Sequence, residues 1–143
     1  MVAPHHMEAQ VAAQVAITFV DETPGVQRRE AFRLTLWSEK VTARELIERR
    51  VRHEVEIYNR TTPEIFEGLV QPTDAERILN GWRLKTPRRL DADRQVARAL
   101  EAFSHSRILL LVDDRQLDTL DGEVMLTRDT EVCFYKLVPL VGG

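Results

Sequence analysis

Two stretches near the start of the chain alternate between apolar and polar residues, which is the period of a β-strand with one buried face. In residues 15–20 the apolar face carries valine, isoleucine and phenylalanine, and in residues 30–37 it carries phenylalanine and two leucines. The segment between them, Asp21–Gly25, contains proline and glycine, the residues that most often form turns. We therefore predict an antiparallel hairpin.

The period then changes to that of an amphipathic helix. Thr42-Ala43-Arg44-Glu45 matches a capping box, in which threonine caps the helix and glutamate bonds back to it. We expect the helix to run from about Ala43 to Tyr58. Its apolar residues form one stripe: Leu46, Ile47, Val51, Val55 and either Ile57 or Tyr58. Charged residues of alternating sign occupy the opposite face: Arg44, Glu48, Arg52 and Glu56.

Residues 59–106 have the pattern of an inserted helical segment. Thr73-Asp74-Ala75-Glu76 is a second capping box, predicting a short helix through Leu79 that Asn80-Gly81 ends. Asp91 is the expected cap of a further helix. The apolar residues of that helix are Val96, Ala99, Leu100 and Phe103.

Basic residues gather between the two predicted inserted helices and at the start of the second: Arg83, Lys85, Arg88, Arg89 and Arg94. They are open to two interpretations, a phosphate-binding patch or a solvated loop. No exposed aromatic residues are interleaved with them and they match no known phosphate motif. We therefore favour the solvated loop.

The C-terminal part of the chain returns to strand patterns. After Arg107, residues 108–112 form a continuous apolar run, typical of a strand covered on both faces, and Asp113-Asp114 predicts a tight turn into Arg115–Leu117. Residues 130–138 are rich in β-branched and aromatic residues and predict the final strand. With period 2, we assign Val132 and Phe134 to the core and expect Tyr135 and Leu137 on the open face of the sheet as a small apolar docking surface. The alternative is that the inserted helices cover this face.

The order hairpin, helix, insertion and strands predicts an α+β fold. The first and last strands can pair in parallel once the helix crosses the sheet, which gives a mixed sheet with one main helix packed on it. We expect a disordered segment at 1–13, a domain at 14–138 with a helical insertion at about 59–106, and a flexible tail at 139–143. This arrangement is that of a β-grasp domain.

The tail runs from the final strand into Pro139, Leu140, Val141, Gly142 and Gly143. Glycine has no Cβ, so two terminal glycines can enter a slot that is too narrow for other residues. Five extended residues reach about 15 Å, enough to place a carboxylate in another protein's active site. The alternative is a frayed terminus, since small residues are common at chain ends.

Composition narrows the class of protein. The chain has 143 residues, 43% hydrophobic and 30% charged, with a net charge of -3, which gives no support for a nucleic-acid partner. No apolar run approaches the roughly 18 residues of a membrane span, and the N-terminus lacks the pattern of a secretion signal. The single cysteine, Cys133, excludes an internal disulfide and a cysteine-based metal cluster. We expect a cytoplasmic protein without a membrane partner.

No catalytic constellation is visible in the sequence. There is no Ser-His-Asp spacing and no glycine-rich phosphate loop, and the four histidines, His5, His6, His53 and His105, are scattered. Cys133 lies in mid-strand and is expected to be inert. We therefore expect a protein that is not an enzyme and that holds neither a metal nor a cofactor of its own.

The hairpin, the capped helix and the terminal segment resemble ubiquitin-like proteins. The similarity is greatest to the prokaryotic sulfur carriers, the molybdopterin-synthase small subunit and the thiamine sulfur carrier. Residues 126–132 match the turn into their last strand, Phe134-Tyr135 and Pro139 match its aromatic and proline features, and Gly142-Gly143 match the reactive end. The segment 59–106 has no counterpart in those small carriers, so the chain resembles an elaborated bacterial member of the superfamily.

This resemblance implies chemistry at the C-terminus. A partner enzyme would adenylate Gly143 with ATP and Mg²⁺, and Gly142 and Gly143 would be the reacting residues. Pro139, Leu140 and Val141 would contact the channel of that enzyme. The product would be a protein modifier attached to a target, with a conjugating enzyme as a possible second partner. The alternatives are a sulfur carrier with a C-terminal thiocarboxylate and a non-enzymatic β-grasp interaction module.

Overall fold

The computed structural model describes residues 14–78 and 81–137, and the chain divides into two compact units. The first comprises Met1–Ala43 and Ser106–Gly143, and the second is Arg44–His105. The protein is α+β, with strands in both units, and the two helices of the described residues are assigned almost entirely to the second.

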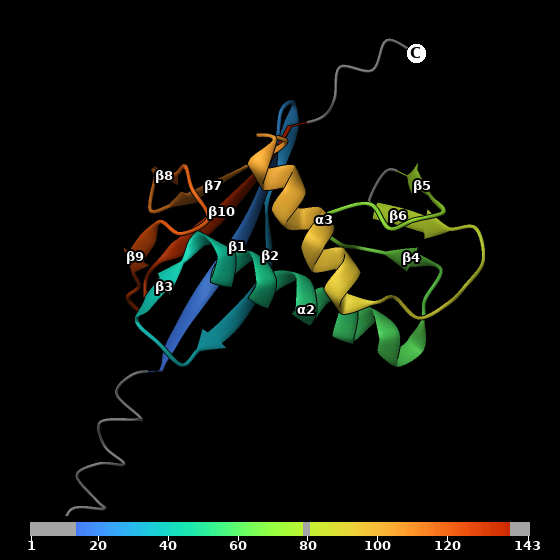
Figure 1. Ribbon diagram of the computed structural model, residues 1–143, viewed down its shortest axis with the longest axis horizontal. Coiled ribbons are helices and arrows are strands. Elements are labelled where there is room, and N and C mark those ends of the chain that lie inside the picture. The colour runs from blue at the N-terminus through green and yellow to red at the C-terminus, as the bar shows by residue number, and fades with distance from the viewer. Residues whose placement is uncertain (1–13, 79–80, 138–143) are drawn as a thin grey trace, which may run out of the picture. The chain divides into compact units, whose positions relative to one another are not determined.

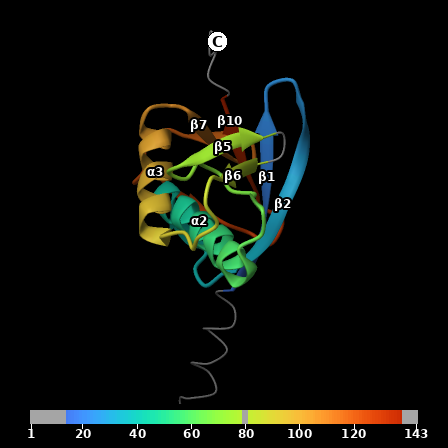
Figure 2. The same ribbon diagram turned by 90° about the vertical axis from the view of Figure 1, so that its right-hand side faces the viewer.

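The first unit contains a five-stranded mixed sheet in the order β2-β1-β10-β7-β8 (Figure 1). Its strands are β1 (Val15–Thr23), β2 (Val26–Leu36), β7 (Ile108–Val112), β8 (Arg115–Leu117) and β10 (Glu131–Lys136). β10 pairs in parallel with β1, and the other neighbours are antiparallel. Both the predicted hairpin, seen as the long β1–β2 ribbon in Figure 2, and the predicted parallel pairing of first and last strands are confirmed.

One face of this sheet carries a cluster of three aromatic residues, of which Phe19 and Phe134 are buried and Phe32 is half-buried. Phe19 on β1 lies between Phe32 on β2 and Phe134 on β10, with ring centroids 5.1 and 5.9 Å away. Val132 and Phe134 are fully buried, as the alternation of the final strand predicts. The predicted assignment of these two residues to the core is confirmed.

A second, two-stranded sheet in the first unit was not apparent in the sequence pattern. It pairs β3 (Lys40–Thr42) with β9 (Glu123–Met125) in antiparallel register. The backbone N–H of Leu126 donates to the carbonyl of Glu39 at 2.7 Å, which extends this pairing by one bond. Each strand has three residues, too few for a periodic pattern to stand out.

The second unit contains two helices and three short strands: α2 (Ala43–Thr61), β4 (Ile65–Phe66), β5 (Ala75–Ile78), β6 (Gly81–Leu84) and α3 (Ala92–Ser104). Helix α2 begins where predicted and runs three residues further than expected. Its predicted apolar stripe is buried, and Tyr58 rather than Ile57 belongs to it, since Ile57 is exposed. Asp91 caps α3 by accepting a hydrogen bond from the Arg94 N–H, as predicted.

The prediction of a short helix at 73–79 is wrong. Residues 75–78 form β5, which pairs antiparallel with β6, and β6 pairs with β4 on its other side (Figure 1). Asp74 has a positive φ of 54°, so the backbone turns there instead of entering a helix. We also predicted that the basic residues after Gly81 lie in a loop. That prediction is wrong for residues 82–84, which belong to β6. The inserted segment therefore contains a small sheet as well as the one helix α3.

Candidate functional site

The final strand occupies the middle of the main sheet. β10 is hydrogen-bonded to β1 on one side and to β7 on the other. The last bond described at its carboxyl end joins the Leu137 N–H to the Arg107 carbonyl at 3.0 Å. Here Lys136 Nζ also lies 3.5 Å from the Asp21 carboxylate. Because a central strand is fixed on both edges, Leu137 is held at a defined position.

The residues predicted to react come after this position in the sequence, separated from Leu137 by residues 138–141. Gly142 and Gly143, and the predicted channel contacts Pro139, Leu140 and Val141, lie outside the described residues. Their roles stay predictions. The two predicted docking residues, Tyr135 and Leu137, are described: Tyr135 is half-buried, and 38% of Leu137 is exposed.

Register places further apolar side chains beside Tyr135 on the same face of the sheet. Tyr135 is opposite Leu109 on β7, and Cys133 is opposite Leu111. Both leucines are half-buried. On β10, Val132 and Phe134 alternate with Cys133 and Tyr135, face the opposite side of the sheet and are fully buried. Leu109 and Leu111 were not predicted as part of this surface, because a continuous apolar run does not show which residues face outward.

A charged cluster borders this apolar surface. Arg28 on β2 pairs with Glu131 on β10 and lies 3.6 Å from Glu22 on β1. Glu22 is the register partner of Tyr135, so the cluster and the apolar surface share the same face of the sheet. The surface is thus an apolar centre with a polar rim, a common composition for a protein contact.

Cys133 lies within this face and is buried. Burial, together with the nearby Glu22 carboxylate, raises the pKa of its thiol to about 11, while Arg28 opposes the shift. A thiol with such a pKa is almost entirely protonated at neutral pH and is a poor nucleophile. Its chemistry agrees with the expectation of an inert residue.

Other candidate chemistry is scarce in the part of the chain that the structure describes. No group of three or more His, Cys, Asp or Glu side chains within it is arranged to hold a metal ion. Burial lowers the pKa of His53 on α2, which favours the neutral ring. Among the described residues no helix is both long and apolar enough to cross a membrane.

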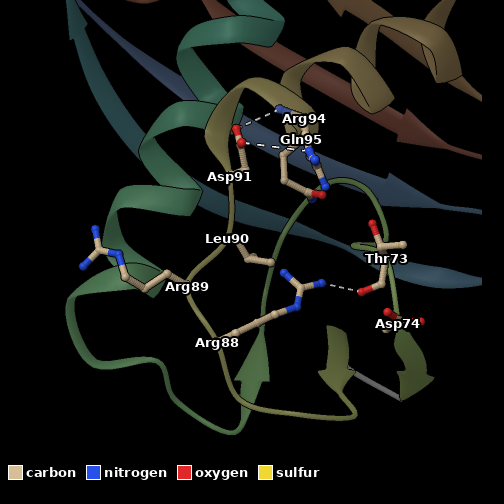
Figure 3. A pocket seen from close by; sticks show the side chains of 8 residues that line it. All are labelled: Thr73, Asp74, Arg88, Arg89, Leu90, Asp91, Arg94 and Gln95. Atoms are coloured by element: carbon tan, nitrogen blue, oxygen red, sulfur yellow. Dashed lines mark hydrogen bonds and ion pairs between the residues drawn. The ribbon is translucent and has the colours of Figure 1, made fainter.

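The basic residues singled out in the sequence do not act as one group. Arg83 on β6 is paired with Glu64 and Glu76, at 3.3 and 3.6 Å. Arg88, Arg89 and Arg94, in contrast, line a hollow in the second unit, where the Arg89 side chain points away from the other two (Figure 3). The sequence pattern contained all three but gave no reason to separate them from Arg83.

Comparison with known proteins adds no relative to this picture: no protein-family model, curated protein sequence or solved structure matches the chain.

Proposed function

We propose that this protein is a β-grasp, ubiquitin-like modifier that is activated at Gly142-Gly143 by an adenylating enzyme and transferred to a target. The β-grasp assignment is supported by the strand order, in which a hairpin flanks a parallel pair made by the first and last strands. It is also supported by helix α2, which follows the hairpin in the chain and carries one buried apolar stripe.

The observation that carries this proposal is the central position of β10. The strand that precedes the tail in the sequence is hydrogen-bonded to a neighbour on both sides, so its residues are fixed within the sheet. A partner that docks on the sheet beside Tyr135 and Leu137 would therefore meet a fixed surface that is close in sequence to Gly142-Gly143. Pre-organisation of this kind lowers the entropic cost of placing a reactive group in an active site.

The chemistry at Gly143 would belong to the partner. A carboxylate is a poor acyl donor, so the enzyme joins it to the α-phosphate of ATP, with Mg²⁺, and releases pyrophosphate. An enzyme thiolate then displaces AMP and forms a thioester. A lysine amine of the target finally displaces the thiolate and leaves an amide bond. This protein supplies only the carboxylate and the surface that positions it.

The apolar surface of Leu109, Leu111, Tyr135 and Leu137 is the proposed contact for the adenylating enzyme. Its centre is partly exposed and its rim carries the ion pairs of Arg28. Aromatic residues at the centre of such surfaces contribute most to binding energy. Replacement of Tyr135 by alanine should therefore weaken activation without altering the chain end itself.

The direct experiment is activation in vitro with a chain that ends at Gly143. Candidate adenylating enzymes from the same host are incubated with the chain, ATP and Mg²⁺, and pyrophosphate release and thioester formation are measured. We expect both signals with the full chain and neither with a chain that ends at Val141. Equal signals from the two chains would contradict the proposal.

A sulfur carrier is the second candidate, because its first step is the same. In that case sulfide attacks the adenylate and leaves a C-terminal thiocarboxylate, which increases the intact mass by the difference between sulfur and oxygen.

If the full chain and the truncated chain bind the same partners and neither is activated, an interaction module is the better account.

A further inference from the structure

Two residues on the Tyr135 face of the main sheet are buried although their neighbours on that face are not. Val20 on β1 and Cys133 on β10 are register partners, and their exposed fractions are only 3% and 9%. Leu111, the partner of Cys133 on β7, is half-buried, and so is Tyr135. Because a small side chain on such a face is buried only where a longer one lies over it, Val20 and Cys133 have a cover.

Arg28 on β2 is placed to be that cover. Its Nε lies 3.6 Å from the Glu22 carboxylate on β1, and its Nη2 contacts the Glu131 carboxylate on β10. Glu22 comes two residues after Val20 on β1. Glu131 comes two residues before Cys133 on β10, which runs parallel to β1. Since side chains two residues apart share a face, a guanidinium paired with both carboxylates crosses above Val20 and Cys133.

The surroundings of the Cys133 thiol agree with this placement. Burial and the Glu22 carboxylate raise its pKa, and the Arg28 guanidinium lowers it, so both charged groups lie close to the sulfur. The Arg28 side chain is 49% exposed, which fits a long side chain with one side on the sheet and the other in water. Because exposed ion pairs contribute little to stability, this contact can open without unfolding of the sheet.

We propose that Arg28 is a latch. In the free chain, its ion pairs with Glu22 and Glu131 hold its side chain over Val20 and Cys133. When the latch opens, these two residues join the apolar surface of Leu109, Leu111, Tyr135 and Leu137 and enlarge the area that a partner can contact. The latch is a property of the chain by itself, and only its use in docking rests on the proposed function.

The test is the rate at which Cys133, the one cysteine of the chain, reacts with iodoacetamide, an uncharged thiol reagent, followed by intact mass. Arg28→Ala should raise the rate by about fivefold or more, because the thiol no longer needs an opening step before it reacts. Loss of the positive charge alone would disfavour the thiolate and slow the reaction, so an increase reports the lost cover. Sodium chloride at about 1 M should accelerate the native chain but not Arg28→Ala, because salt screens exposed ion pairs.

Arg33→Ala is the matched control. Arg33 is exposed on the same strand, and its register partner Thr18 shares a face of β1 with Val20. It forms no ion pair with another described residue, so its removal should leave the rate unchanged. The latch is overturned if Arg28→Ala reacts at the native rate, or if both variants are accelerated equally. If Arg28→Ala unfolds at lower denaturant than the native chain, the salt response of the native chain decides, and no acceleration by salt also overturns the latch.

The activation assay separates this inference from the proposed function. Arg28→Ala should lower the KM of the chain for the adenylating enzyme, because the surface is already open. A raised KM would show that Arg28 contacts the enzyme directly and would overturn its use as a latch in docking. If no enzyme activates the native chain, the proposed function fails, while the thiol measurements still decide whether Arg28 is a latch.

Discussion

A single buried ion pair shows how much individual residues matter in the second unit. Arg50 and Glu54 are one turn apart on α2, and both are buried, with 2% and 8% of each residue exposed. The guanidinium and carboxylate are 3.1 Å apart, and the other Glu54 oxygen accepts the Leu69 N–H at 3.1 Å. The carboxylate thus neutralises a buried cation and fixes the loop after β4.

We predict that Glu54→Ala lowers the free energy of unfolding by about 3–5 kcal/mol, because it leaves Arg50 buried without its counter-charge. The matched control is Glu56→Ala. Glu56 pairs with Arg60 at the same spacing on the same helix, but both side chains are exposed. Its removal should cost less than about 0.5 kcal/mol. Denaturant unfolding measures both, and similar losses would show that burial is not the cause.

Cys133 gives a prediction about pH. Because burial raises the pKa of its thiol to about 11, the folded state favours the protonated form. Its contribution to stability is complete below about pH 9, where an unburied thiol ionises, and is lost as the pH rises to about 11. Denaturant unfolding should therefore show a steeper loss of stability over this range for the native chain than for Cys133→Ala. Parallel curves would argue against a buried thiol.

At the scale of elements, the long strands of the main sheet and the two described helices were predictable from a period or an apolar run, and the short strand β8 from the turn Asp113-Asp114 before it. The failures lie where elements are short. Thr73-Asp74-Ala75-Glu76 matches a capping box, but threonine and aspartate favour turns as strongly as helix caps. The sequence signal that favours a hairpin is Asn80-Gly81, a pair common in hairpin turns; β5 ends at Ile78 and β6 begins at Gly81.

The candidate site was predictable only in part for a related reason. Period 2 placed Val132 and Phe134 in the core and Tyr135 outside it. The neighbours that complete the surface, Leu109 and Leu111, depend on how β7 is aligned with β10, and that register is a tertiary property. The buried partners Arg50 and Glu54 were also missed, because charged residues are rarely buried unless they pair.

The start of α3 gives a prediction at this scale. Asp91 accepts a hydrogen bond from the Arg94 N–H at 3.2 Å, so it satisfies one of the free donors of the first turn. Asp91→Ala should destabilise the protein by about 1 kcal/mol, and Asp91→Asn should be nearly neutral because asparagine is an equally good cap. Denaturant unfolding of the two variants is the measurement. An equal loss in both would assign the role of Asp91 to its charge instead.

At the scale of the whole molecule, the main sheet is complete only when the last strand, β10, is in place. β10 supplies the partner for both β1 and β7, so residues 131–136 join segments that are far apart in the chain. The described hydrogen bonds of this region end at Leu137. Because the sequence predicts a flexible tail at 139–143, we expect removal of Gly142-Gly143 to leave the thermal unfolding midpoint unchanged, which makes the truncated chain a valid control for function.

The central claim is that Gly143 becomes joined to another protein, and the tryptic fragment of that bond tests it most directly. Trypsin cleaves after Lys136, so a conjugated lysine would keep the branch Leu-Val-Pro-Leu-Val-Gly-Gly, residues 137–143. Mass spectrometry of proteins purified with a tagged chain from its host should detect this branch on target lysines. The account predicts the branch with the full chain and its absence with a chain that ends at Val141. Its absence from both, with the C-terminus of the full chain recovered unmodified, would contradict the account.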